Sequence, residues 1–259
     1  MLRSLYTAYT GMLNEQNRLD ILSNNLANVT TAGYKQENTA SQAFDKVLGI
    51  KIRDVSEAFN DCAIGYMSLG VKLGEAYTDY AQGSLRKTNG TYDMAIAGDG
   101  FFAVRYVNKN GVESEKYTRD GNFRITNDGH VTDVDGNELK TESGVLQVPV
   151  DAANISIKRD GSVYADDVYV DKIKIVDFED YDYLEKFGNN MYTAVNGATE
   201  KDADMELRQG YIEQSNVNSV REMVDMITMQ RAYQAGSKAI QNADSMLDKA
   251  VNSVGSVSG

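Results

Sequence analysis

Hydrophobic side chains recur every seven residues near both ends of the chain. A seven-residue apolar repeat is typical of α-helices that pack along one face. The pattern predicts a helix over residues 2–29, about 40 Å long, and a longer helix that starts near residue 216. The two series are Leu5, Met12, Leu19 and Leu26, and then Met226, Tyr233, Ile240, Leu247 and Val254, with Val217, Val220, Val224 and Ile227 opening the second run.

These two helices can pair with each other or pack against other chains. A helix pair of this length carries more apolar surface than one partner covers. We therefore favour lateral packing against other chains, with a helical hairpin within one chain as the alternative.

Three asparagines, Asn24, Asn25 and Asn28, fall just before the first stripe stops, and Gly33 follows them. Asparagine is a poor helix former because its side chain offers the backbone competing hydrogen bonds. One interpretation is a fraying helix end that Gly33 closes in the left-handed conformation. The other is a set of buried or interfacial amides that fix how this helix pairs.

The middle of the chain, residues 91–190, has the chemistry of β-strands. Short apolar and aromatic runs alternate with Asp-Gly pairs, and the first turn is the Gly98-Asp99-Gly100 sequence. Asp-Gly pairs at seven- or eight-residue spacing are typical of successive hairpins. This segment is therefore predicted to form an all-β domain.

Residues 36–90 and 191–215 show no clean period and are interpreted as an extended connector. The sequence thus predicts a mixed α and β fold. Long terminal helices within residues 1–35 and 216–259 form a coiled-coil-like stalk, and a central all-β domain spans 91–190.

Composition excludes several classes of protein. A net charge of −12 over 259 residues argues against binding to nucleic acid or anionic lipid, which needs clustered Lys and Arg. The single cysteine, Cys62, excludes an internal disulfide and a thiolate metal cluster. The N-terminus lacks the apolar run of a cleaved signal peptide, and no apolar window is long enough to insert in a membrane.

No catalytic, cofactor-binding or metal-binding residues are predicted. The sequence GDGFFA matches a dinucleotide fingerprint, but the residues after it have strand character where that motif needs a helix. DVDGNE places neither Gly nor Glu where a calcium loop needs them, and the one histidine, His130, makes a catalytic triad implausible. Carboxylate pairs are too numerous for one to be selected. A glycan-acting enzyme or a glycan-binding module on a helical stalk therefore remains the rival hypothesis.

Three longer motifs follow one another along the chain. The N-terminal motif is SLYTAYTGM followed by LDILSNNLANVTTAGYK, and the second is QGSLRKTNGTYDMAIAGDGFFAV followed by YTRDGNF. The third is LRQGYIEQSNVNSVREMVDMITMQRAYQAGSKAIQNADSML. In this order the three motifs resemble the bacterial flagellar basal-body rod and hook protein family. Chain length and YTRDGNF resemble the distal-rod members most, although Tyr92 departs from their pattern. Proximal rod and hook members are the alternatives.

The resemblance implies a structural protein of the flagellar basal body that is exported by the flagellar type III apparatus without a cleaved signal. Its implied partners are copies of itself, in a helical polymer, and other rod and hook proteins. The terminal helices would line a hollow shaft that transmits torque to the hook, and Asn24, Asn25 and Asn28 would set register between subunits. The expected interface residues are Leu5, Met12, Leu19, Leu26, Asn24, Asn25, Asn28, Val224, Ile227, Tyr233, Ile240 and Leu247, and the expected turn residues are Gly33, Gly98 and Gly100.

Overall fold

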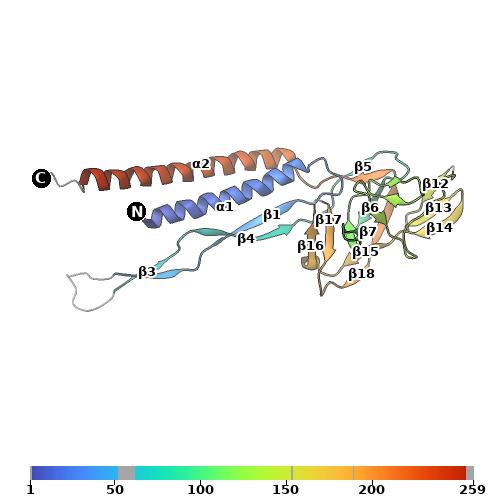
Figure 1. The fold of residues 1–259 in the computed structure, drawn as a ribbon, viewed down its shortest axis with the longest axis horizontal. Helices are drawn as coiled ribbons and strands as arrows, with labels where there is room; N and C mark the ends of the chain where they lie inside the picture. The colour runs from blue at the N-terminus through green and yellow to red at the C-terminus, as the bar shows by residue number, and fades with distance from the viewer. Residues whose placement is uncertain (1, 52–61, 153, 189, 255–259) are drawn as a thin grey trace. The chain divides into compact units, whose positions relative to one another are not determined.

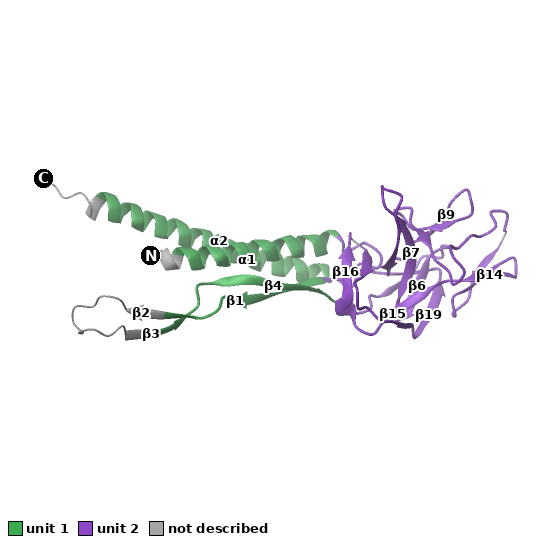
Figure 2. Ribbon diagram, turned by 60° about the horizontal axis from the view of Figure 1, so that its bottom comes forward, with its two compact units in different colours: residues 1–27, 37–79, 218–259 green, residues 28–36, 80–217 purple. Residues whose placement is uncertain are grey.

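The chain folds into two compact units. The computed structural model describes residues 2–51, 62–152, 154–188 and 190–254 (Figure 1). Unit 1 consists of residues 1–27, 37–79 and 218–259, and unit 2 consists of residues 28–36 and 80–217 (Figure 2). The chain therefore passes between the units after residues 27, 36, 79 and 217.

Unit 1 contains both α-helices, which run side by side (Figure 1). Helix α1 spans Leu2–Ala27, and α2 spans Ser219–Lys249 and continues into the π-helical turn η2, Ala250–Val254. Helix α2 begins after the N-cap residue Asn218, whose side-chain oxygen accepts hydrogen bonds from the backbone N–H groups of Val220 and Arg221. The cap lies two residues after position 216, near which the sequence predicted the start of this helix.

The rest of unit 1 is a pair of β-ribbons. Strand β1 (Glu37–Ala43) pairs antiparallel with β4 (Val71–Thr78), and β2 (Val47–Lys51) pairs with β3 (Cys62–Met67). Helix α1 contacts both β1 and β4. Asn14 of the helix donates a hydrogen bond to the Ser41 hydroxyl.

The predicted fold class is therefore wrong. The described chain has only two α-helices on a mainly β architecture, and residues 37–51 and 62–78 form strands along most of their length rather than an extended connector. These strands share a unit with the helices, and β1 and β4 pack on α1, so the helices do not form a separate coiled-coil stalk. Most of the β1–β4 ribbon is only half covered or exposed, which left no clear alternation of apolar and polar residues for the sequence to reveal.

Unit 2 is built almost wholly from short strands. Its largest sheet has nine strands, of which seven follow the order β16-β17-β8-β7-β11-β10-β9, while β15 joins β7 and β18 joins β15. These strands are β7 (Phe101–Val107), β8 (Glu113–Thr118), β9 (Arg124–Ile125), β10 (Val131–Thr132), β11 (Glu138–Leu139), β15 (Ile175–Phe178), β16 (Leu184–Phe187), β17 (Met191–Ala194) and β18 (Glu200–Asp202). A 3₁₀ turn, η1 (Tyr181–Tyr183), precedes β16.

Three smaller sheets complete unit 2. One orders its strands β12-β13-β14, and the others pair β6 with β19 and β5 with β20. Their bounds are β5 (Leu85–Lys87), β6 (Met94–Gly98), β12 (Ile155–Ile157), β13 (Ser162–Ala165), β14 (Val168–Lys172), β19 (Met205–Gln209) and β20 (Tyr211–Glu213).

Strand β7 divides the core of unit 2 into two clusters. Adjacent side chains on a strand point to opposite faces, and Phe101 and Phe102 accordingly belong to different buried clusters. Because β7 directly follows the Gly98-Asp99-Gly100 turn, no helix stands behind those glycines to hold a dinucleotide.

Candidate assembly interface

The seven-residue stripes of the two helices face each other within the chain. Gly236 lies against α1, where an added Cβ would be 3.5 Å from the Cβ of Met12. The helices therefore pair in the hairpin that was the alternative interpretation. The predicted positions that become half-buried are Leu5, Met12, Leu19 and Leu26 on α1, and Tyr233, Ile240 and Leu247 on α2.

Two other predicted positions face away from this pairing. Val224 and Ile227, which were expected at the interface between subunits, are 56% and 52% exposed. With Val220 and Met223, which are also exposed, they follow the i, i+3, i+4, i+7 spacing of one helix face. We call these four residues the outer stripe of α2.

Helix α1 carries a second exposed apolar face, which we call the outer stripe of α1. It consists of Tyr6, Tyr9 and Leu13, and Tyr9 is 51% exposed. Sequence reasoning missed this face because it followed only the seven-residue series. The spacing of three and four residues between these side chains was the available signal.

Asn25 makes its hydrogen bonds inside the chain. Its side-chain oxygen accepts from the backbone N–H of Glu37 at 3.1 Å, and its Nδ2 donates to the Glu37 carbonyl at 2.8 Å. Nδ2 also lies 3.4 Å from Oε2 of Glu222 on α2, and the Asn25 side chain is fully buried. This amide therefore joins α1, β1 and α2 of one chain and is not available to a neighbouring chain.

The other asparagines and Gly33 lie at and beyond the end of α1. Asn24 is exposed on the last turn of the helix, and the Oδ1 of Asn28 accepts a hydrogen bond from the Thr31 hydroxyl. Gly33 has a φ of 67° but lies six residues after the last residue of α1, Ala27. It therefore turns the chain within unit 2 and does not cap the helix.

The two other predicted turn glycines flank Asp99 between β6 and β7. Gly98 has a φ of 120° and Gly100 a φ of 111°, values that favour glycine. A Cβ on Gly100 would be 2.8 Å from the Cβ of Ala203, so the turn is also closely packed.

A buried network of charges lies where the chain enters and leaves unit 2. Lys35 Nζ is 2.7 Å from Oε1 of Glu213, and Arg119 Nη1 is 3.5 Å from Oε2 of the same carboxylate. The side chains of Lys35 and Glu213 are each 1% exposed and that of Arg119 is 3% exposed. We call these three residues the junction.

Backbone groups complete the junction. Lys35 Nζ also donates to the Ala81 carbonyl at 2.9 Å, and Arg119 Nη1 donates to the Gly98 carbonyl at 2.9 Å. The Gly33 N–H donates to the Glu213 carbonyl, and a Cβ on Gly33 would collide with the backbone at residues 119 and 120. The three members come from the three quoted motifs, which therefore meet at one point in space. Sequence reasoning did not select them because each motif shows only one of the three charges.

Asp120 lies directly beside this turn. Its Oδ1 accepts the backbone N–H of Asn122, and its Oδ2 lies 3.5 Å from Nδ2 of Asn190, which also donates to the Ala32 carbonyl. Burial raises the pKa of the Asp120 carboxyl to about 6, although these hydrogen bonds act in the opposite direction.

The described residues offer no evident site for metal chemistry or membrane insertion. Among them no group of three or more His, Cys, Asp or Glu side chains is arranged to hold a metal ion. In the same part of the chain, no helix combines the length and the apolar character needed to cross a membrane. The outer stripes and the junction thus define the class of the protein, a structural subunit whose terminal helices pair but keep apolar faces exposed.

Comparison with known proteins agrees with this class. Residues 5–35 match the family described as flagella basal body rod protein, and residues 208–253 match flagellar basal body rod FlgEFG protein C-terminal. Residues 95–165 match the flagellar hook protein FlgE/F/G D1 domain.

Full-length relatives extend the agreement over nearly the whole chain. The chain is 34% identical to the flagellar basal-body rod protein FlgG of Bacillus subtilis, over 97% of this chain and 99% of the relative. It is 32% identical to FlgG of Buchnera aphidicola (subspecies Acyrthosiphon pisum), over 96% and 98%. FlgF of Caulobacter vibrioides is 31% identical, over 98% of both chains. The chain belongs to the flagellar basal-body rod protein family. This membership confirms the resemblance of the three motifs and the expectation of a structural protein rather than an enzyme.

Proposed function

We propose that this chain is a structural subunit of the distal part of the flagellar basal-body rod. Copies assemble helically through their terminal helices into a hollow shaft that transmits torque to the hook. The subunit reaches this site through the flagellar type III export apparatus, and it meets other rod and hook proteins at the ends of its own segment.

The observation that carries this proposal is the pair of outer stripes. Helix pairing and the β1–β4 ribbon partly cover the seven-residue series as far as Leu247, yet exposed apolar side chains remain on both helices, among them Tyr9 and Ile227. Large exposed apolar faces mark sites of protein association. An interface between unlike faces whose rotation does not close produces an open helical filament.

The proposed interface differs from the one expected from the sequence. Leu19, Leu26, Tyr233 and the other half-buried members of the stripes support the helix pair inside one chain, and Asn25 is committed to Glu37 and Glu222. Val224 and Ile227 remain interface residues, now with Tyr6, Tyr9, Leu13, Val220 and Met223.

The distal position rests on the relatives named FlgG, which match the chain over almost their whole length. The match to FlgF of Caulobacter vibrioides supports the second candidate, another level of the same rod. Electron microscopy of isolated basal bodies that carry a labelled subunit distinguishes the two, because each predicts a different axial level.

Assembly is tested with Ile227→Asp and a matched control, Ala232→Asp, at an exposed position on a different face of the same helix. Both variants should keep the wild-type circular dichroism, since neither side chain is buried. Ile227→Asp should abolish polymer formation measured by sedimentation and electron microscopy, and Ala232→Asp should not. Normal polymerisation of Ile227→Asp would overturn the proposal.

A further inference from the structure

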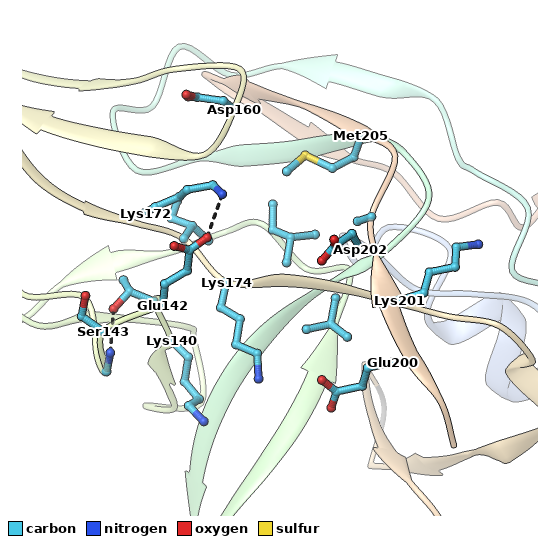
Figure 3. Close-up of a pocket in the computed structure, with 16 residues that line it drawn as sticks. Lys140, Glu142, Ser143, Asp160, Lys172, Lys174, Glu200, Lys201, Asp202 and Met205 are labelled. Carbon is cyan, nitrogen blue, oxygen red and sulfur yellow. Dashed lines mark hydrogen bonds and ion pairs between the residues drawn. The ribbon is translucent and has the colours of Figure 1, made fainter. Parts of the chain in front are cut away.

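Unit 2 carries an open trough of about 1200 Å³ on the side of its large sheet where β15 and β18 lie. Ile175 and Val176 of β15 and Met205 of β19 line it with apolar surface. Charged side chains from the segments around residues 140, 172 and 200 surround this apolar surface (Figure 3).

Each of the four lysines of the trough pairs with a carboxylate of the same chain. Lys140 and Lys174 share Glu115, at 2.6 and 2.8 Å. Lys172 pairs with Glu142 at 2.7 Å, and Lys201 pairs with Asp177 at 2.8 Å. These ion pairs offset all but one of the four positive charges.

Three further carboxylates of the trough form no salt bridge among the described residues, although the charges of Lys158 and Lys172 act on Asp160. Glu200 accepts a hydrogen bond from the Tyr117 hydroxyl, Asp160 accepts from the backbone and hydroxyl of Ser162, and Asp202 is exposed at the trough wall (Figure 3). The trough is therefore acidic around an apolar floor. Such a surface fits a group that combines a cation with an apolar body.

The hairpin between β7 and β8 has the complementary character. Val107 and Val112 are 50% and 63% exposed on either side of Lys109. The nearby carboxylate of Glu113 pairs with Arg105, and no carboxylate of the described residues forms a salt bridge with the ammonium group of Lys109. Backbone hydrogen bonds between Asn108 and both Val112 and Gly111 hold the turn in one conformation, which lowers the entropic cost of docking. We call residues 107–112 the tip.

The tip and the trough lie at different ends of β7. Phe101 and Phe102, which begin the strand, pair with Val176 and Ile175 of the trough floor. Val107, which ends the strand, opens the tip. A protrusion at one end of a strand and a complementary hollow beside its other end are arranged for head-to-tail contact between copies, and such contacts propagate.

We propose that the tip of one copy docks into the trough of the next copy along the rod, with Lys109 among Glu200, Asp202 and Asp160. This contact rests on the proposed function and adds a second, electrostatic interface to the apolar one on the helices. Because copies with a net charge of −12 repel each other, a local pair of opposite charges fixes which surfaces meet.

Charge exchange tests the contact. Lys109→Glu and Asp202→Lys should each raise the critical concentration for polymerisation about tenfold or more, because each places like charges together. The double variant K109E/D202K should return it to near the wild-type value. Lys87→Glu makes the same change on exposed β5 and should have no effect. Since all these side chains are exposed, circular dichroism should remain that of the wild type.

A carbodiimide, which joins a lysine amine to a carboxylate with loss of water, provides a second readout. Polymers grown from mixed ¹⁴N and ¹⁵N chains should give a cross-link between Lys109 of one chain and Asp202 or Glu200 of another. If the wild type polymerises and Ile227→Asp blocks it, yet K109E polymerises normally and the cross-link is missing, this contact is overturned and the proposed function stands. If the wild type forms no polymer at all, both fall.

Discussion

Lys35 and Glu213 form an ion pair of 2.7 Å in which each side chain is only 1% exposed. The pair joins the segment that follows α1 to strand β20, and Arg119 approaches the same carboxylate. Taking charges out of water is costly, so such a network is stable only while every member keeps its partners. The junction therefore holds together the segments through which the chain enters and leaves unit 2.

Glu213→Gln should destabilise unit 2 strongly. It leaves Lys35 and Arg119 buried without a counter-charge, which costs about 3–5 kcal/mol. The free energy of unfolding from urea titration measures this loss, and Glu185→Gln, at an exposed position of β16, is the control. A loss below about 1 kcal/mol, the range of an exposed ion pair, would show that the junction is hydrated.

Gly33→Ala tests the turn beside the junction. At a φ of 67° the added Cβ is strained and meets the backbone of residues 119 and 120, so we expect a loss of about 2 kcal/mol or more. Gly11→Ala provides the contrast, because nothing lies within 4 Å of a Cβ there. In the interior of α1 that change should stabilise by about 0.5–1 kcal/mol. Equal effects of the two substitutions would argue against the described turn.

Asn25→Asp tests the amide that joins α1, β1 and α2. Aspartate cannot donate to the Glu37 carbonyl, and it places a second carboxylate beside Glu222. We expect a loss of about 2–4 kcal/mol in urea unfolding followed by helical circular dichroism. Asn24→Asp, one residue earlier and exposed, should change stability little. If both variants were equally stable, Asn25 would not be buried as described.

Asp120 should make the free energy of unfolding decrease as the pH rises, whereas in acid denaturation it decreases as the pH falls. Its folded pKa of about 6 lies above the ordinary value of 3.8, so the folded state binds the proton more tightly. Its contribution is greatest below about pH 4 and is lost as the pH rises through about 6, a decline of about 3 kcal/mol. Asp120→Asn should remove this decline from the pH profile of unfolding, whereas exposed Asp128→Asn should retain it. Identical profiles would show that Asp120 is solvated.

The sequence predicted the helices better than their contacts. The seven-residue series placed both helices, because periodicity reports which residues share a face. The series did not show whether each helix packs against a helix of the same chain or of another chain, since a leucine such as Leu19 can pack in both arrangements. The ribbon of β1 and β4 was missed because its strands lack a regular alternation of apolar and polar residues.

The junction shows a different limit. Lys35, Arg119 and Glu213 lie far apart in sequence, and a single charge within a motif does not identify its buried partner. Asn25 was recognised as an unusual amide. Its partner, the backbone of Glu37, could not be predicted because the contact exists only when β1 packs along α1.

The central claim is that neighbouring copies bury the outer stripes in the rod. Hydroxyl-radical footprinting of the side chains in dilute monomer and in isolated rods tests it most directly. Tyr9 and Met223, which are exposed in the single chain, should be oxidised in the monomer and strongly protected in the rod. Half-buried Tyr233 should change much less. Equal oxidation of Tyr9 and Met223 in both states would contradict assembly through these faces.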